Sequence, residues 1–152
     1  MDHSTETRSR DLLENVLVPV AHQTDAEITA RALEPYEPTE ITALFVVEKG
    51  EGVPDKTPVA QSKEQAADSF DAVREVFPDA NDHTAYGRDV AKAIFQAAEE
   101  LDASAIAYRA REGNRLARFL SGDLSLKLVT QADRPVIALP QRATTDTDTD
   151  TN

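Results

Sequence analysis

The stretch that decides the fold is Ala105-Ile-Ala-Tyr-Arg-Ala-Arg-Glu-Gly-Asn-Arg-Leu-Ala-Arg-Phe-Leu-Ser-Gly-Asp123, with the residues that follow it up to Pro140. It predicts a strand at Ser104–Tyr108, an arginine-rich loop, a helix over Asp123–Ala132 and a last strand at Pro135–Leu139. Parallel α/β sheets bind ligands outside the carboxyl ends of their strands. A helix N-terminus at such a place favours an anion. We therefore look for an anion site in the loop after the first of these strands.

Strand and helix segments alternate along the rest of the chain. Apolar runs at Asn15–Val20 and Ile41–Glu48 predict strands buried on both faces, and His83–Gly87 predicts a shorter one. Apolar residues at helical spacing predict helices over Asp25–Leu33, Gln61–Phe77 and Asp89–Leu101. This alternation predicts an α/β fold, a doubly wound parallel sheet with helices on both faces.

Local signals refine three of these elements. Pro19 cannot donate to a sheet ladder, so we expect it at the end of its strand. Thr24 and Glu27 have the spacing of a capping box at the start of the first helix. One face of the last helix is expected to hold Leu124, Leu128 and Val129.

The chain divides into one domain and two tails. We expect a flexible leader over residues 1–13, a domain over 14–140 and a disordered tail over 141–152, where a Thr-Asp repeat offers nothing apolar to bury. A glycine- and proline-containing segment at Lys49–Ala60 predicts a mobile loop. The absence of cysteine excludes disulfides and thiolate metal sites. No apolar run is long enough to span a membrane, so we expect a cytoplasmic protein.

The charge of the chain is strongly negative. It has 28 acidic and 16 basic residues, for a net charge of −12. Such a surface argues against nucleic acid as a partner. It also fits a halophilic protein dissolved in a salty cytoplasm. In that case the charge keeps the protein soluble and does not indicate its function.

Several segments, in order and spacing, resemble the universal stress protein family: Val16–Val20, Gly87–Ile94, Arg115–Asp123 and Arg134–Leu139. The resemblance covers residues 14–140. It implies a five-stranded sheet of order 3-2-1-4-5. It also implies a homodimer joined along the last strand and, in many members, a bound ATP.

ATP-binding members of that family carry the motif G-x-x-G, nine residues, then G followed by Ser or Thr. The matching positions here are Arg109, Glu112, Gly122 and Asp123, so only Gly122 keeps the motif residue. Glycines let backbone amides approach phosphates, whereas Glu112 brings a side chain and a negative charge. Asp123, in the first turn of a helix, would satisfy the amides itself and repel a phosphate. The altered motif predicts weak or absent ATP binding, and we expect no resident cofactor.

The loop after the first strand has also changed. Ala21 stands where the family commonly has an Asp near the adenine and ribose, and His22 follows it. His22 either receives a ligand at the mouth of the crevice or is an exposed loop histidine, and we favour the second interpretation. His3, His22 and His83 share no ligand spacing, so no metal site is predicted.

The loop after the predicted strand at Ser104–Tyr108 holds the only concentrated basic patch in the sequence of this acidic chain. Its four arginines are Arg109, Arg111, Arg115 and Arg118. As a functional site, the patch would bind an anion, because guanidinium groups suit phosphate and carboxylate. As a structural feature, it would pair internally with Glu112, Asp123 and neighbouring acids. We favour internal pairing. Tyr108, at the end of its strand, could line the crevice or pack.

No catalytic residue is predicted, because Ser121 lacks a strand-elbow motif and no metal and base constellation is visible. The leading hypothesis is a non-catalytic stress-response domain that acts on a protein partner such as a transporter or another stress protein. We expect it to be a homodimer that pairs through Pro135, Val136, Ile137, Ala138 and Leu139. The alternative is a small-molecule binder in which Arg109, Arg111 and His22 receive a nucleotide or another anion.

Overall fold

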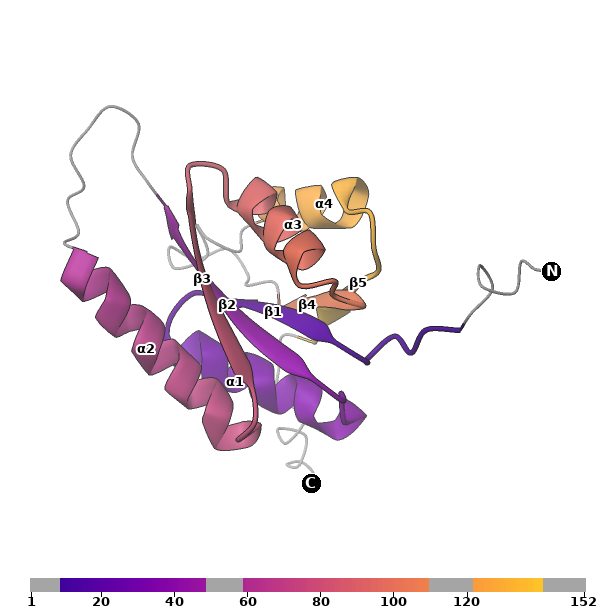
Figure 1. Cartoon of the computed structure of the whole chain (residues 1–152), viewed down its shortest axis with the longest axis horizontal. Coiled ribbons are helices and arrows are strands. Elements are labelled where there is room, and N and C mark those ends of the chain that lie inside the picture. Colours follow the sequence, from indigo (N-terminus) through magenta and orange to yellow (C-terminus); the bar gives the residue numbers. More distant parts are fainter. Residues whose placement is uncertain (1–8, 49–58, 110–121, 141–152) are drawn as a thin grey trace, which may run out of the picture.

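The computed structural model describes residues 9–48, 59–109 and 122–140 (Figure 1). Its elements, in chain order, are β1 (Val16–Val20), α1 (Gln23–Leu33), the short 3₁₀ helix η1 (Glu34–Tyr36), β2 (Ile41–Glu48), α2 (Val59–Val76), β3 (Asn81–Gly87), α3 (Val90–Glu100), β4 (Ala105–Arg109), α4 (Gly122–Gln131) and β5 (Val136–Leu139). All paired strands are parallel, in the order β3-β2-β1-β4-β5. The predicted fold class and the strand order that the resemblance implied are therefore confirmed.

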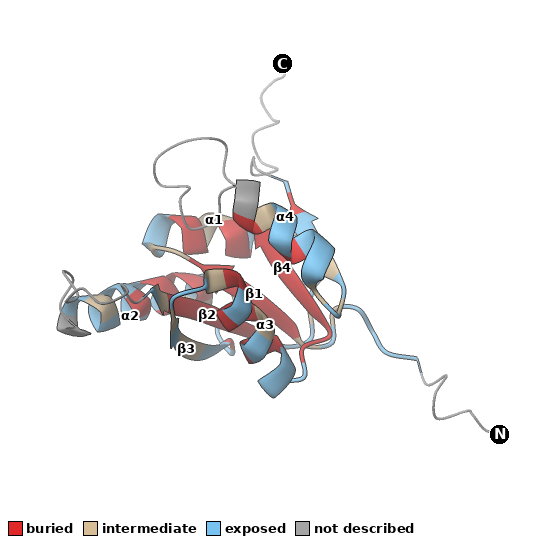
Figure 2. Ribbon diagram, turned by 90° about the horizontal axis from the view of Figure 1, so that it is seen from above, coloured by how far each residue is buried: buried red, intermediate tan, exposed pale blue. Residues whose placement is uncertain are grey.

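Helices cover both faces of the sheet. α1 and α2 pack together on one face, and α3 and α4 lie on the other (Figure 1). The side chains of β1 alternate between these layers: Val16, Val18 and Val20 belong to the core on the α1 and α2 side, and Leu17 to the core on the other side. Buried residues accordingly run along the central strands (Figure 2). Because both faces of the sheet are covered, the sequence of such a strand is a continuous apolar run.

Pro19 lies one residue before the end of β1, close to where we expected it. The Val16 amide donates to Glu40 on the β2 side, at 2.9 Å, and alternate residues of a parallel strand face the same neighbour. Pro19 therefore faces β4. The pairing of β1 with β4 covers only Val16 with Ala105 and Leu17 with Ile106, so the missing N–H of Pro19 interrupts no ladder bond.

The predicted capping box of α1 is wrong. The helix begins at Gln23, so Thr24 lies inside it, and His22 is the N-cap. His22 has an extended backbone, with φ −158°, and its Nδ1 accepts a hydrogen bond from the Asp25 amide at 3.3 Å. His22 is therefore half-buried in a capping role, which corrects the expectation of an exposed loop histidine.

The predicted apolar face of α4 is correct for two of its three residues. Leu124 and Leu128, one turn apart, are buried against the α3 side of the sheet. Val129 is 59% exposed and Leu126 is 63% exposed, so the stripe that packs inward is narrower than predicted. α4 therefore turns apolar side chains toward solvent.

The end of the expected leader lies against the domain. Arg10 Nη1 contacts the Asp102 carboxylate at 3.3 Å, and the Leu13 carbonyl accepts a hydrogen bond from the Thr39 amide at 2.9 Å. Residues 1–8, the predicted Thr-Asp tail and positions 49–58 of the predicted loop lie outside the described residues. Among the helices that the structure describes, none has the length and apolarity to cross a membrane.

Candidate functional site

The strand order reverses between β1 and β4, which makes their carboxyl ends the place where folds of this kind bind ligands. Three of the predicted site residues meet there. Ala21 and His22 directly follow β1, and Arg109 is the last residue of β4. Gly122 and Asp123 are the first two residues of α4. Arg111, Glu112, Arg115 and Arg118 lie outside the described residues.

Arg109 points into the protein. Its side chain is 7% exposed, and Nη2 lies 3.5 Å from Oδ1 of Asp25, whose side chain is completely buried. The two residues are 84 positions apart in the chain. This contact pairs Arg109 internally with an acid on α1. The predicted pairing of Arg111, Arg115 and Arg118 lies outside the described residues.

Asp25 joins three parts of the site. Besides the contact with Arg109, its Oδ2 accepts a hydrogen bond from the Ala21 amide at 3.1 Å. Its own amide donates to Nδ1 of His22. Asp25 also lies in the first turn of α1, where the helix dipole stabilises a negative charge. The loop after β1, the start of α1 and the end of β4 are therefore held together through one carboxylate.

The buried pair is both costly to form and costly to break. Removing both charges from water carries a desolvation penalty of several kcal/mol for each ion. Removing only one partner typically destabilises a protein by about 3–5 kcal/mol, because it leaves the other charge buried and uncompensated. Arg109 and Asp25 are thus mutually dependent.

Sequence reasoning missed Asp25, although a signal for it exists. Asp25, Thr29 and Leu33 follow one another at i, i+4 spacing, and all three are buried. An acid in line with Leu33 on the inner stripe of a helix must find a partner in the core. Tyr108, for which two interpretations were open, is 3% exposed and packs in the core on the α3 and α4 side.

The predicted dimer strand is an edge of the sheet. Among the strands that the structure describes, β5 pairs only with β4. Pro135, just before β5, and Ala138 are exposed, Val136 and Ile137 are half-buried, and Leu139 is buried. An apolar cavity of about 270 Å³ lies beside it, lined by Leu12, Leu13, Leu33, Tyr36 and the residues from Ile137 to Pro140.

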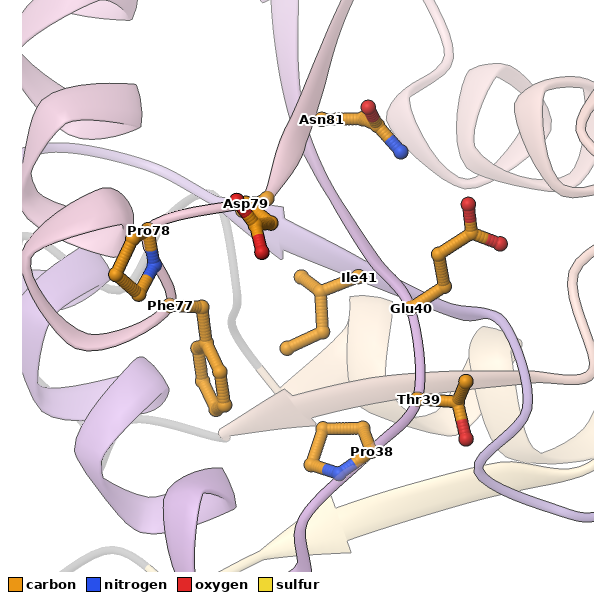
Figure 3. Close-up of a pocket in the computed structure, with 9 residues that line it drawn as sticks. Pro38, Thr39, Glu40, Ile41, Phe77, Pro78, Asp79 and Asn81 are labelled. Atoms are coloured by element: carbon orange, nitrogen blue, oxygen red, sulfur yellow. The ribbon is translucent and has the colours of Figure 1, made fainter.

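A second cavity, of about 310 Å³, lies at the amino ends of β2 and β3 (Figure 3). Its lining includes Ile41 and Asn81, the first residues of β2 and β3. The side chains of Ile41 and Phe77 point toward one another there, and Glu40 adds a carboxylate (Figure 3). Sequence reasoning predicted no site residue in this place. Within the described ranges, no three His, Asp or Glu side chains are placed to hold a metal ion.

Comparison with known proteins gives a consistent result. A sequence model of the Universal stress protein family matches residues 13–140. The structure resembles a universal stress protein from Archaeoglobus fulgidus, with a TM-score of 0.65 and 18% identity over 83% of this chain and 98% of that chain. The universal stress protein from Archaeoglobus fulgidus in complex with dAMP gives a TM-score of 0.62 and 21% identity, over 83% of this chain and 97% of that one.

A universal stress protein in complex with cAMP gives a TM-score of 0.57 and 13% identity, over 85% of this chain and 98% of that chain. A comparison with curated protein sequences found no match. At these identities, the likeness to solved structures shows the fold.

Proposed function

This chain belongs to the universal stress protein family, and from that premise we propose that it is a non-catalytic stress-response domain with weak or absent ATP binding. We further propose that it is a homodimer and that it acts through contacts with a protein partner, such as a transporter or another stress protein. The acidic composition supports a place in a salty cytoplasm. Loss of the far-UV circular dichroism signal below molar salt would support that setting, and full stability in dilute buffer would argue against it.

One observation carries the proposal of weak ATP binding: the burial of Arg109 against Asp25. Arg109 stands at the first glycine position of the ATP motif. Its guanidinium already faces a carboxylate, so a triphosphate would have to displace Asp25 or bind without this cation. Displacement would leave Asp25 buried and charged next to an anion, which is strongly unfavourable.

The distribution of exposed apolar side chains supports a homodimer through β5. Leu12 and Tyr36, which are 46% and 58% exposed, line the cavity beside β5. Leu126 and Val129 are exposed on α4, the helix that leads into β5. An exposed edge strand flanked by apolar surface is a pairing template, and a second copy of the chain would cover it.

The dimer is tested by light scattering in molar salt, the condition that the composition favours. A mass of twice the 16.6 kDa of the chain is expected. A monomer at every protein concentration examined would refute the proposed dimer.

The alternative function, a small-molecule binder, is supported by the nucleotides in two similar structures, dAMP and cAMP. In this chain Arg109, Arg111 and His22 would receive a nucleotide or another anion. A thermal-shift panel of nucleotides and anionic metabolites distinguishes the two functions. Stabilisation by any of these compounds favours the binder, and none by any of them favours the protein-contact function.

A further inference from the structure

We propose that Asp25 acts as an internal anion that holds Arg109 and thereby excludes phosphate-bearing ligands from the carboxyl edge between β1 and β4. This inference deepens the proposed weak ATP binding and rests on it. Asp25 would thus contribute to this exclusion from outside the family's ATP motif, in addition to the altered motif positions.

The groups around the Asp25 carboxylate are of the kinds that bind a phosphate. A phosphate bound at a strand-to-helix loop contacts backbone amides, the positive end of a helix dipole and a basic side chain. The Asp25 carboxylate has all three kinds of partner. Oδ2 accepts from the Ala21 amide at 3.1 Å, the residue lies in the first turn of α1, and Oδ1 lies 3.5 Å from Nη2 of Arg109. The carboxylate is therefore held as a bound anion would be.

The Asp25 side chain is 0% exposed and that of Arg109 is 7% exposed, so little water screens the charges. An incoming anion could not share Arg109 by approaching it from solvent. It would have to break the internal contact, which ties together residues 84 positions apart.

Neutralising Asp25 without changing its shape should therefore create an anion site. In Asp25→Asn, the amide oxygen can still accept from Ala21, but the negative charge beside Nη2 of Arg109 is removed. A small anion such as inorganic phosphate then restores the charge balance and stabilises the folded chain by mass action.

The matched control is Glu27→Gln on the same helix. Glu27 pairs with Arg31 at 3.1 Å, but the two side chains are 43% and 54% exposed, so this change removes an equal charge from a solvated pair. A third variant, Asp25→Asn with Arg109→Gln, removes the cation that is proposed to receive the phosphate.

The experiment is a titration with inorganic phosphate on the full chain, at constant high ionic strength, followed by thermal unfolding and calorimetry. We expect phosphate to bind Asp25→Asn at least tenfold more tightly than the wild type or Glu27→Gln, and the gain to disappear in the double variant. If Asp25→Asn is unfolded alone, phosphate should restore its helical circular dichroism.

Equal phosphate affinity in a folded Asp25→Asn and the wild type would overturn the inference, as would failure of phosphate to refold an unfolded variant. A gain that survives in the double variant would also overturn it. These results are distinct from failure of the proposed function, which would appear as tight ATP binding by the wild type.

Discussion

Loss of the Arg109 charge is the perturbation for which the structure gives the clearest magnitude. Two unit charges 3.5 Å apart, as in the Arg109–Asp25 pair, attract by about 5 kcal/mol at an effective dielectric constant of 20. Removing one member of a buried pair typically costs about 3–5 kcal/mol. We therefore expect Arg109→Leu to lower the free energy of unfolding by about 3–5 kcal/mol, a large part of the 5–15 kcal/mol that is usual for a domain.

The assay is urea unfolding followed by circular dichroism in molar KCl, at fixed protein concentration so that any dimer contributes equally. Arg31→Ala is the matched control, because Arg31 forms an exposed i, i+4 pair with Glu27 on α1. It should cost about 0.3–0.5 kcal/mol.

A second variant separates the charge from the packing. Asp25→Asn combined with Arg109→Leu leaves no buried charge at this pair and keeps an acceptor for the Ala21 amide, so it should recover part of the loss. If Arg109→Leu costs no more than Arg31→Ala, the pair is solvated and the reasoning from burial is wrong.

Three further predictions concern the cap of α1, the turn before β5 and the β5 edge. His22→Ala should lower the free energy of unfolding by about 1 kcal/mol, whereas His22→Asn should preserve it, because Asn is an effective N-cap. Equal losses of stability in thermal melts of the two variants would contradict the capping role of His22. The side-chain hydrogen bond and the charge of Arg134 lower the pKa of the exposed Asp133 carboxyl below its ordinary value of 3.8. The contact therefore stabilises the fold at pH values above 3.8, and this stabilisation is lost as the pH falls through the lowered pKa. Arg134→Gln should raise that pKa in an NMR titration, and an unchanged titration would contradict the contact. Ala138→Asp, at an exposed position of β5, should give a monomer by light scattering. Tyr86→Asp, on the other edge strand β3, should leave the dimer intact. Dimers in both variants would rule out the β5 interface.

The alternation of apolar runs and amphipathic stripes was sufficient to predict the sheet and its helices. Runs such as Ile41–Glu48 are buried on both faces, so their composition alone reports a central parallel strand. The strand order came from the family resemblance, since no local pattern says which strands pair. The position of Pro19 follows from its missing amide, which is a local property.

The partner of Arg109 could not be predicted from local patterns. The contact with Asp25 spans 84 positions, and a pattern within one segment does not report a contact over that length of chain. The cap of α1 was mispredicted because Thr24 is a better intrinsic cap than His22. The helix begins at Gln23, two residues before the predicted start at Asp25. Val129 was assigned inward because helical spacing does not say how wide the buried stripe is.

The most direct test of the account is calorimetric titration of the wild-type chain with ATP in molar salt, beside a variant that restores the family motif through Arg109→Gly, Glu112→Gly and Asp123→Ser. Weak or absent binding of ATP by the wild type is expected. Binding by the folded variant alone would show that the residues at these three positions prevent ATP binding in the wild type. Tight binding of ATP by the wild type would contradict the account, because the buried Arg109–Asp25 pair would then not keep the nucleotide out.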